Sequence, residues 1–137
     1  MIGVVIVAHG GLAREYLAAV EHVVGQQAGI EAISIEIDHD RDAKEREICA
    51  AANSVDQGDG VIVVTDLYGG SPSNLSLLAC QSGNRQILYG ANLPMLIKLA
   101  KSRQKTVSDA VRLALEAGKK YIDSQNVSSD HESRSKK

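Results

Sequence analysis

The sequence contains few aromatic residues and no long apolar segment. Phenylalanine and tryptophan are absent, and four tyrosines make up an aromatic content of 3% in 137 residues. The core must therefore be aliphatic. No apolar run approaches the roughly 20 residues that cross a bilayer, and the first such run has neither the basic residues before it nor the cleavage site of a signal peptide. We expect a cytoplasmic location.

The sequence also lacks an excess of basic charge and a metal-binding or redox cysteine motif. Its formal net charge of −2 offers no basic footprint for nucleic acid. Cys49 and Cys80 lie far apart in an arrangement that fits no metal or redox motif. With 137 residues, the chain is long enough for one domain with a substantial core.

Four segments have the composition of β-strands. Ile2–Ala8 and Gly60–Thr65 are continuous apolar runs rich in β-branched residues, which is typical of strands covered on both faces. Ile30–Ile37 alternates between apolar and polar residues, as an outer strand does, and Arg85–Tyr89 is a shorter fourth segment.

Helical patterns separate and follow these strands. The predicted helices are Leu12–Gln26, Asp42–Val55, Ser73–Ser82, a short helix after Pro94, and Thr106–Ile122. This alternation predicts an α/β fold with a doubly wound, mainly parallel sheet and helices on both faces. The two wholly apolar strands belong in the centre, which gives the strand order 2-1-3-4 and a switch point between strands one and three.

The last residues differ in composition from the rest. Residues 124–137 contain five serines and one branched apolar residue, so they bury too little apolar surface to offset the entropy of ordering. We therefore expect a domain over residues 1–123 and a disordered polar tail over residues 124–137.

Two loops follow the central strands and carry candidate functional residues. The first contains A-H-G-G (Ala8–Gly11) and the second contains D-L-Y-G-G-S-P-S-N (Asp66–Asn74). Because ligands of doubly wound sheets bind beyond the carboxyl ends of the strands at the switch point, His9 and Asp66 are predicted to meet. The carboxylate would accept the proton of one ring nitrogen and leave the lone pair of the other free to attack.

Both loops also have features of a phosphate site. Glycines allow backbone amides to approach a ligand closely, and the N-terminus of a helix presents free N–H groups to anions. In the second loop, Ser71 suits an N-cap and Pro72 the first helical position. The predicted phosphate-binding residues are Gly10, Gly11, Gly69, Gly70 and Ser71.

Together, V-I-V-A-H-G-G-L-A and D-L-Y-G-G-S-P-S-N resemble the mannose-family EIIA domain of the bacterial phosphoenolpyruvate:sugar phosphotransferase system. The resemblance extends over about residues 1–122. It implies a phosphotransferase in which His9 accepts a phosphoryl group from the phosphocarrier HPr and passes it to an EIIB-type domain. Asp66 would hydrogen-bond the His9 ring, while the Gly69–Gly70 backbone and Ser71 would hold the phosphoryl oxygens. No cofactor is implied, and contact with the membrane would be indirect, through permease components.

Assembly is a further expectation. The resemblance implies a dimer with a C-terminal strand exchanged between subunits, whereas here a predicted helix ends near Ile122 and polar residues follow. A sheet that ends on the short Arg85–Tyr89 strand has an open edge, which proteins usually cover. We therefore expect a homodimer that forms through this edge or through the helices that follow it.

Other classes of protein share parts of these patterns. A flavodoxin-like FMN protein needs hydroxyl groups in the first loop, which A-H-G-G-L-A lacks. A response-regulator receiver needs an acidic pair after its first strand to hold magnesium, and Ala8 and His9 occupy that place. A non-catalytic interaction module, a regulatory phosphorelay protein without sugar transport, and the phosphocarrier subunit of a dihydroxyacetone kinase remain alternatives.

A second group of polar residues lies on the connection after the predicted second strand. Asp38, His39 and Asp40, with Asp42 close by, could suggest a metal site. Residues of this kind between a strand and a helix usually cap the helix and face water. We therefore expect no metal site here.

Overall fold

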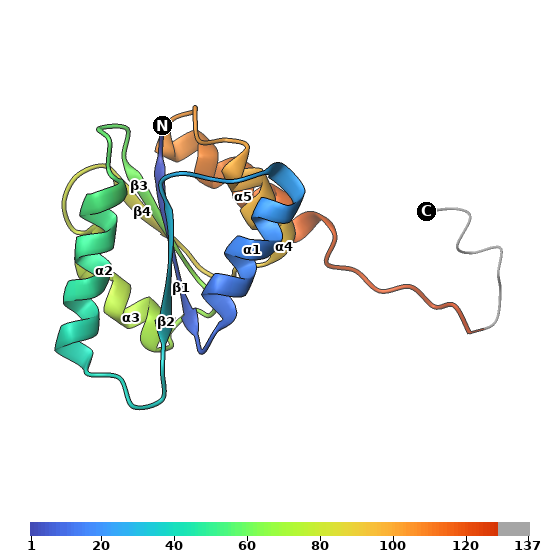
Figure 1. The fold of residues 1–137 in the computed structure, drawn as a ribbon. Coiled ribbons are helices and arrows are strands. Elements are labelled where there is room, and N and C mark those ends of the chain that lie inside the picture. Colours follow the sequence, from blue (N-terminus) through green and yellow to red (C-terminus); the bar gives the residue numbers. More distant parts are fainter. Residues whose placement is uncertain (129–137) are drawn as a thin grey trace.

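The computed structural model describes residues 1–128 and contains a four-stranded parallel sheet (Figure 1). Its strand order is β2-β1-β3-β4, and every neighbouring pair is parallel. The strands are β1 (Gly3–His9), β2 (Ile30–Ile35), β3 (Val61–Thr65) and β4 (Arg85–Leu88). The predicted α/β class and strand order are confirmed.

Helices cover both faces of this sheet. The helices are α1 (Leu12–Val24), α2 (Arg41–Val55), α3 (Ser71–Ser76), the 3₁₀ turn η1 (Leu78–Cys80), α4 (Leu93–Ala100) and α5 (Val107–Lys120). Figure 1 shows α1, α4 and α5 on one face, and α2 and α3 on the other. This two-sided cover is the doubly wound arrangement that the sequence predicted.

Two aliphatic layers form because side chains alternate along the buried strands. Val4, Ile6 and Ala8 of β1 pack in the layer beneath α1, α4 and α5, whereas Val5 and Val7 pack in the layer beneath α2 and α3. All five of these residues are at most 2% exposed. β1 is therefore held from both sides up to the residue that precedes His9.

The register of the sheet brings the ends of three strands together. β1 pairs with β3 so that Val7 lies opposite Thr65, and it pairs with β2 so that His9 lies opposite Ile35. Asp66 directly follows Thr65. His9, Asp66 and the loop after β2 consequently lie at the same carboxyl edge.

The predicted helix over Ser73–Ser82 is wrong in its extent. α3 begins earlier, at Ser71, and ends at Ser76, and η1 follows it. The hydroxyl of Ser76 donates a 2.6 Å hydrogen bond to the carbonyl of Pro72, a local bond that competes with regular helix geometry. The backbone then tightens, and the Cys80 amide donates to the Leu77 carbonyl, three residues back.

The predicted tail lies partly outside the described residues. From Ile122 to Ser128 every residue is exposed and none belongs to a helix or strand, and Figure 1 shows this segment leading away from α5. The rest of the predicted tail, residues 129–137, is outside the described part. Within residues 1–128, no helix has both the length and the apolar composition that crossing a membrane requires.

We predict that removal of residues 124–137 leaves the domain intact. Both apolar layers are built from residues before this segment, so truncation after Asp123 removes no core contact. The melting temperature, followed by circular dichroism, should stay within about 1 °C of the full chain. A fall of several degrees would show that the segment stabilises the domain.

Candidate functional site

One carboxylate oxygen holds His9 in place. Oδ2 of Asp66 accepts a 3.0 Å hydrogen bond from the backbone N–H of His9 and lies 2.9 Å from Nδ1 of its ring. Because the carboxylate acts as acceptor, Nδ1 carries the proton and Nε2 keeps its lone pair. The His9 side chain is 49% exposed and that of Asp66 is 9% exposed. The ring can therefore be reached from solvent while its orienting carboxylate stays covered.

Tyr16 of α1 lies close enough to Asp66 to be affected by its charge, whereas its sequence position predicted only that it belongs to a helix. Its hydroxyl donates a 3.1 Å hydrogen bond to the carbonyl of Ala91, and the Ala91 amide donates to the carbonyl of Thr65 at 3.0 Å. Burial, and then the charge of Asp66, raise the pKa of Tyr16. A neutral Tyr16 thus connects α1 to the end of β3, beside Asp66.

The other carboxylate oxygen of Asp66 is buried. Oδ1 has no hydrogen-bond partner among residues 1–128. A buried acceptor without a donor costs free energy, and the two contacts at Oδ2 are the ones that hold this side chain in place. Just before it, the buried hydroxyl of Thr65 donates to the carbonyl of Leu67 at 3.0 Å and fixes the turn after β3.

Gly70, which follows the turn at Gly69, lies close to the histidine ring. Gly69 has φ +87°, in the left-handed region that favours glycine. A Cβ atom at Gly70 would lie 3.5 Å from Cε1 and 3.9 Å from Nε2 of His9. A side chain at Gly70 would thus occupy space next to the free nitrogen.

The predicted capping role of Ser71 is wrong. Gly70 is the N-cap of α3, Ser71 is its first residue and Pro72 its second, and no side chain caps this end. The reason is the backbone conformation of Gly70, which is extended with φ −86° and ψ −178°, so the helical conformation already starts at Ser71. Ser71 lines a groove beside His9 instead.

In the first loop, not every glycine amide is free to bind a phosphate. Gly10 turns the chain with φ +55°, and its amide donates a 3.0 Å hydrogen bond to the carbonyl of Ile35. Gly11 is the N-cap of α1 and has no side-chain cap. The amide of Gly10 is therefore occupied by β2, and the first turn of α1 begins directly beyond Gly11.

A groove of about 290 Å³ opens beside His9. It lies between the first loop, the start of α3 and the connection from β2 to α2. Its lining residues are His9, Gly10, Ile35, Glu36, Ile37, His39 and Ser71. No motif in the sequence links His39 with His9, although the predicted strand order already places the end of the second strand beside the first.

Asp40 and His39 make local hydrogen-bond contacts in this connection. Oδ1 of Asp40 accepts the amide of Ala43 at 3.2 Å and caps α2, and Nδ1 of His39 lies 2.8 Å from the carbonyl oxygen of Glu36. Within residues 1–128, no three His, Cys, Asp or Glu side chains are grouped so that they could hold a metal ion.

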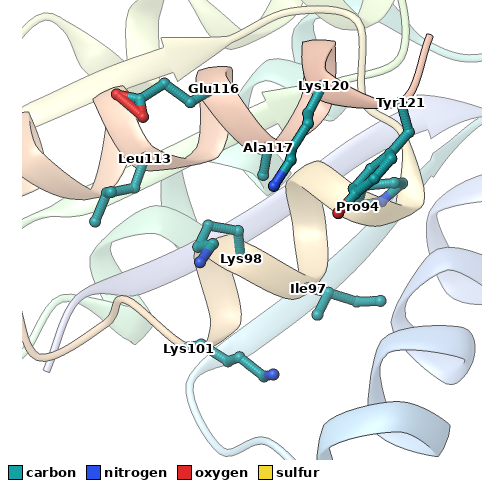
Figure 2. Close-up of a pocket in the computed structure, with 9 residues that line it drawn as sticks. All are labelled: Pro94, Ile97, Lys98, Lys101, Leu113, Glu116, Ala117, Lys120 and Tyr121. Carbon is teal, nitrogen blue, oxygen red and sulfur yellow. The ribbon is translucent and has the colours of Figure 1, made fainter. Parts of the chain in front are cut away.

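A larger hollow lies elsewhere, between α4 and α5. Its volume is about 790 Å³. Figure 2 shows Lys98, Lys101 and Lys120 among its lining residues, together with the apolar Ile97 and Leu113. None of the predicted site residues lines this hollow, so it is separate from the histidine–aspartate pair.

The fold and this pair define a class: a doubly wound α/β domain with an oriented imidazole at its switch point. The model of one family, EIIA-man, described as "PTS system fructose IIA component", matches residues 3–115. The chain therefore belongs to the EIIA-man family of the phosphotransferase system.

Individual relatives agree with this assignment. The chain is 27% identical over 124 residues to the mannose-specific EIIAB component of Escherichia coli K12, a match that covers 88% of this chain and 38% of the relative. The crystal structure of the phosphotransferase system component EIIA from Streptococcus agalactiae is similar, with a TM-score of 0.81, 26% identity and coverage of 90% and 97% of the two chains.

A third relative shows likeness of fold. The mannose/sorbose-specific IIA subunit from Enterococcus faecalis superposes with a TM-score of 0.82 at 22% identity, covering 92% of this chain and 96% of the other.

We predict that Asp66→Asn preserves the ring tautomer of His9. Since the backbone N–H of His9 must find an acceptor at the position of Oδ2, the amide should turn its oxygen to this side and still accept the Nδ1 proton. The ¹⁵N shifts of the ring should report an unprotonated Nε2, as in the unsubstituted chain. A switch of the proton to Nε2 would show that the backbone bond does not set the amide orientation.

Proposed function

We propose that this chain is a phosphohistidine carrier of the sugar phosphotransferase system. His9 accepts a phosphoryl group from HPr on Nε2 and passes it to an EIIB-type partner. The observation that carries this proposal is the contact between Nδ1 of His9 and Oδ2 of Asp66 at 2.9 Å, because it leaves Nε2 as a nucleophile on a half-exposed ring. Membership of the EIIA-man family supports the same role.

The chemistry needs no separate base. The lone pair on Nε2 attacks phosphorus, and a P–N bond forms on His9 as the P–N bond of the donor breaks. The Nδ1 proton stays in place, so the ring of His9 becomes cationic while Asp66, whose Oδ2 faces it, offsets the charge. Onward transfer reverses these steps and returns a neutral ring.

We assign the phosphoryl oxygens to backbone and hydroxyl donors. Gly11 precedes the first turn of α1, and Gly70, preceded by Gly69, lies next to the ring. Ser71 lines the adjoining groove and adds a hydroxyl. Fixed dipoles of this kind stabilise developing charge without rearrangement, and Gly10 contributes the turn that places them.

The surroundings of His9 fit a protein as donor and acceptor. Four large apolar side chains are exposed after the ends of three neighbouring strands: Leu12 (39%), Ile37 (105%), Leu67 (55%) and Tyr68 (81%). Apolar groups gathered at one edge are typical of surfaces that bind other proteins. We infer that both partners dock here in turn.

The identity of the acceptor separates the alternatives. A regulatory phosphorelay protein, or the phosphocarrier subunit of a dihydroxyacetone kinase, would use the same histidine and differ in what takes the phosphoryl group away. The chain spans 38% of the length of the mannose-specific EIIAB relative, so we place only the EIIA step in the proposed domain, residues 1–123.

Incubation with phosphoenolpyruvate, Enzyme I and HPr should add one phosphate per chain. The product should be labile in acid and stable in base, as a P–N bond on an imidazole is, and fragment mass spectrometry should locate it on His9. His9→Ala should abolish labelling and keep the circular dichroism spectrum. Label on Asp66 or Ser71, or label that persists in His9→Ala, would contradict the proposal.

Asp66→Asn provides the matched variant for the mechanism. Loss of a charged hydrogen-bond acceptor should slow labelling by roughly 10- to 100-fold, which corresponds to about 1.5–3 kcal/mol. Pre-steady-state measurement at saturating phospho-HPr isolates the transfer step. An unchanged rate would remove Asp66 from the transfer chemistry.

We also predict a homodimer. In the described chain β4 pairs only with β3, so one edge of β4 keeps backbone groups available for another chain. Multi-angle light scattering at micromolar concentration should give twice the chain mass of 14.6 kDa. A single-chain mass under these conditions would contradict this prediction.

A further inference from the structure

His39 and His9 line the same groove of about 290 Å³. His9 ends β1, whereas His39 belongs to the connection between β2 and α2. β2 lies directly beside β1, with Ile35 opposite His9. The loop that carries His39 therefore starts next to the histidine that we propose as phosphoryl acceptor.

The two rings are held in the same way. Nδ1 of His39 lies 2.8 Å from the carbonyl oxygen of Glu36. A carbonyl can only accept, so Nδ1 carries the proton in the neutral ring. Nδ1 of His9 is likewise tied to an acceptor, Oδ2 of Asp66. Within residues 1–128, neither ring has a hydrogen bond at Nε2.

We propose that His39 binds the phosphoryl group carried by His9. This inference rests on the proposed function. When the phosphoryl group is on His9, Nε2 of His39 takes a proton from solvent and donates a hydrogen bond to a phosphoryl oxygen. The only covalent changes remain the P–N bond formed at His9 and the one broken in HPr; His39 changes its protonation alone.

The charges around the groove favour this role. The ionisable groups that face it or flank it are His9 and Asp66 from the ends of β1 and β3, and Glu36, Asp38, His39 and Asp40 from the β2–α2 connection; α3 contributes the uncharged Ser71. A phosphoryl group adds about −1.5 to −2 charges near neutral pH. No lysine or arginine is among the lining residues, so His39 is the side chain facing His9 that can become a cation.

The effect should depend on pH in a defined direction. Protonated His39 donates from Nε2, so its contribution is present at low pH. As pH rises the ring loses this proton, and a lone pair then faces the phosphoryl oxygens. The contribution of His39 is consequently lost as pH rises.

The test compares equilibrium constants for phosphoryl exchange between phospho-HPr and the full chain, read on phosphate-affinity gels at pH 6.5 and 8.5. His39→Asn keeps an amide that can donate to the Glu36 carbonyl but has no donor at the place of Nε2. We expect it to lower the equilibrium constant about tenfold at pH 6.5, as loss of a charge-assisted hydrogen bond should, with no loss at pH 8.5.

Two further variants separate a direct role from a structural one. His39→Gln can offer a neutral donor near the place of Nε2, so it should recover part of the loss and show no difference between the two pH values. His22→Gln is the matched control, because His22 is exposed on α1 and does not line the groove. It should match the unsubstituted chain at both pH values.

The outcomes distinguish this inference from the proposed function. If the unsubstituted chain takes no phosphate from HPr, the proposed function fails and the role of His39 fails with it. If His9 is labelled but His39→Asn keeps the unsubstituted equilibrium constant at both pH values, the role of His39 alone is overturned.

A measurement on the unsubstituted chain covers the case in which His39→Asn does not fold. Phosphorylation of His9 should move the ¹⁵N signal of His39 Nε2 toward its protonated position at pH 7.5. A signal that stays where it was would overturn the inference.

Discussion

The two hydrogen bonds that converge on Oδ2 of Asp66 are the interaction on which the site depends. One comes from the backbone of His9 and the other involves its ring, at 3.0 and 2.9 Å. The backbone bond joins the last residue of β1 to the residue that follows β3, so it continues the contact between these strands beyond their paired residues. This backbone bond fixes the position of the imidazole relative to the sheet. The same oxygen, Oδ2 of Asp66, also sets the tautomer of the ring.

The remaining architecture keeps these two strand ends still. β1 and β3 are buried on both faces, and Thr65 is itself fully buried, with its hydroxyl bound to Leu67. Tyr16 connects α1 to the same place through Ala91. The half-exposed ring thus contacts a nearly buried carboxylate, so the ring is accessible from solvent while its orientation is fixed.

The sequence was most informative where burial controls structure. Continuous apolar runs identified β1 and β3 as the central strands. Because these strands are neighbours in the predicted order, His9 and Asp66 were predicted to meet. Features that depend on local backbone geometry could not be predicted: α3 ends at Ser76, whose hydroxyl bonds back to the Pro72 carbonyl, and the extended backbone of Gly70 makes that residue the N-cap in place of Ser71. His39 is different, because its place after β2, next to β1, was already implied by the predicted strand order.

The chemistry of a carrier explains why such a groove would contain imidazole and backbone rather than lysine or arginine. A phosphoryl carrier must bind its cargo well enough to receive it and weakly enough to release it, so the phosphorylated state should lie close in free energy to those of its partners. A permanent cation would lower the free energy of the phosphorylated state and so slow onward transfer. Glu36, which lines the groove, repels the phosphoryl charge, whereas backbone amide dipoles and an imidazole that has taken up a proton attract it. These weak attractions and repulsions come from residues at the ends of three strands. Their balance suits a phosphoryl group that must be transferred onward.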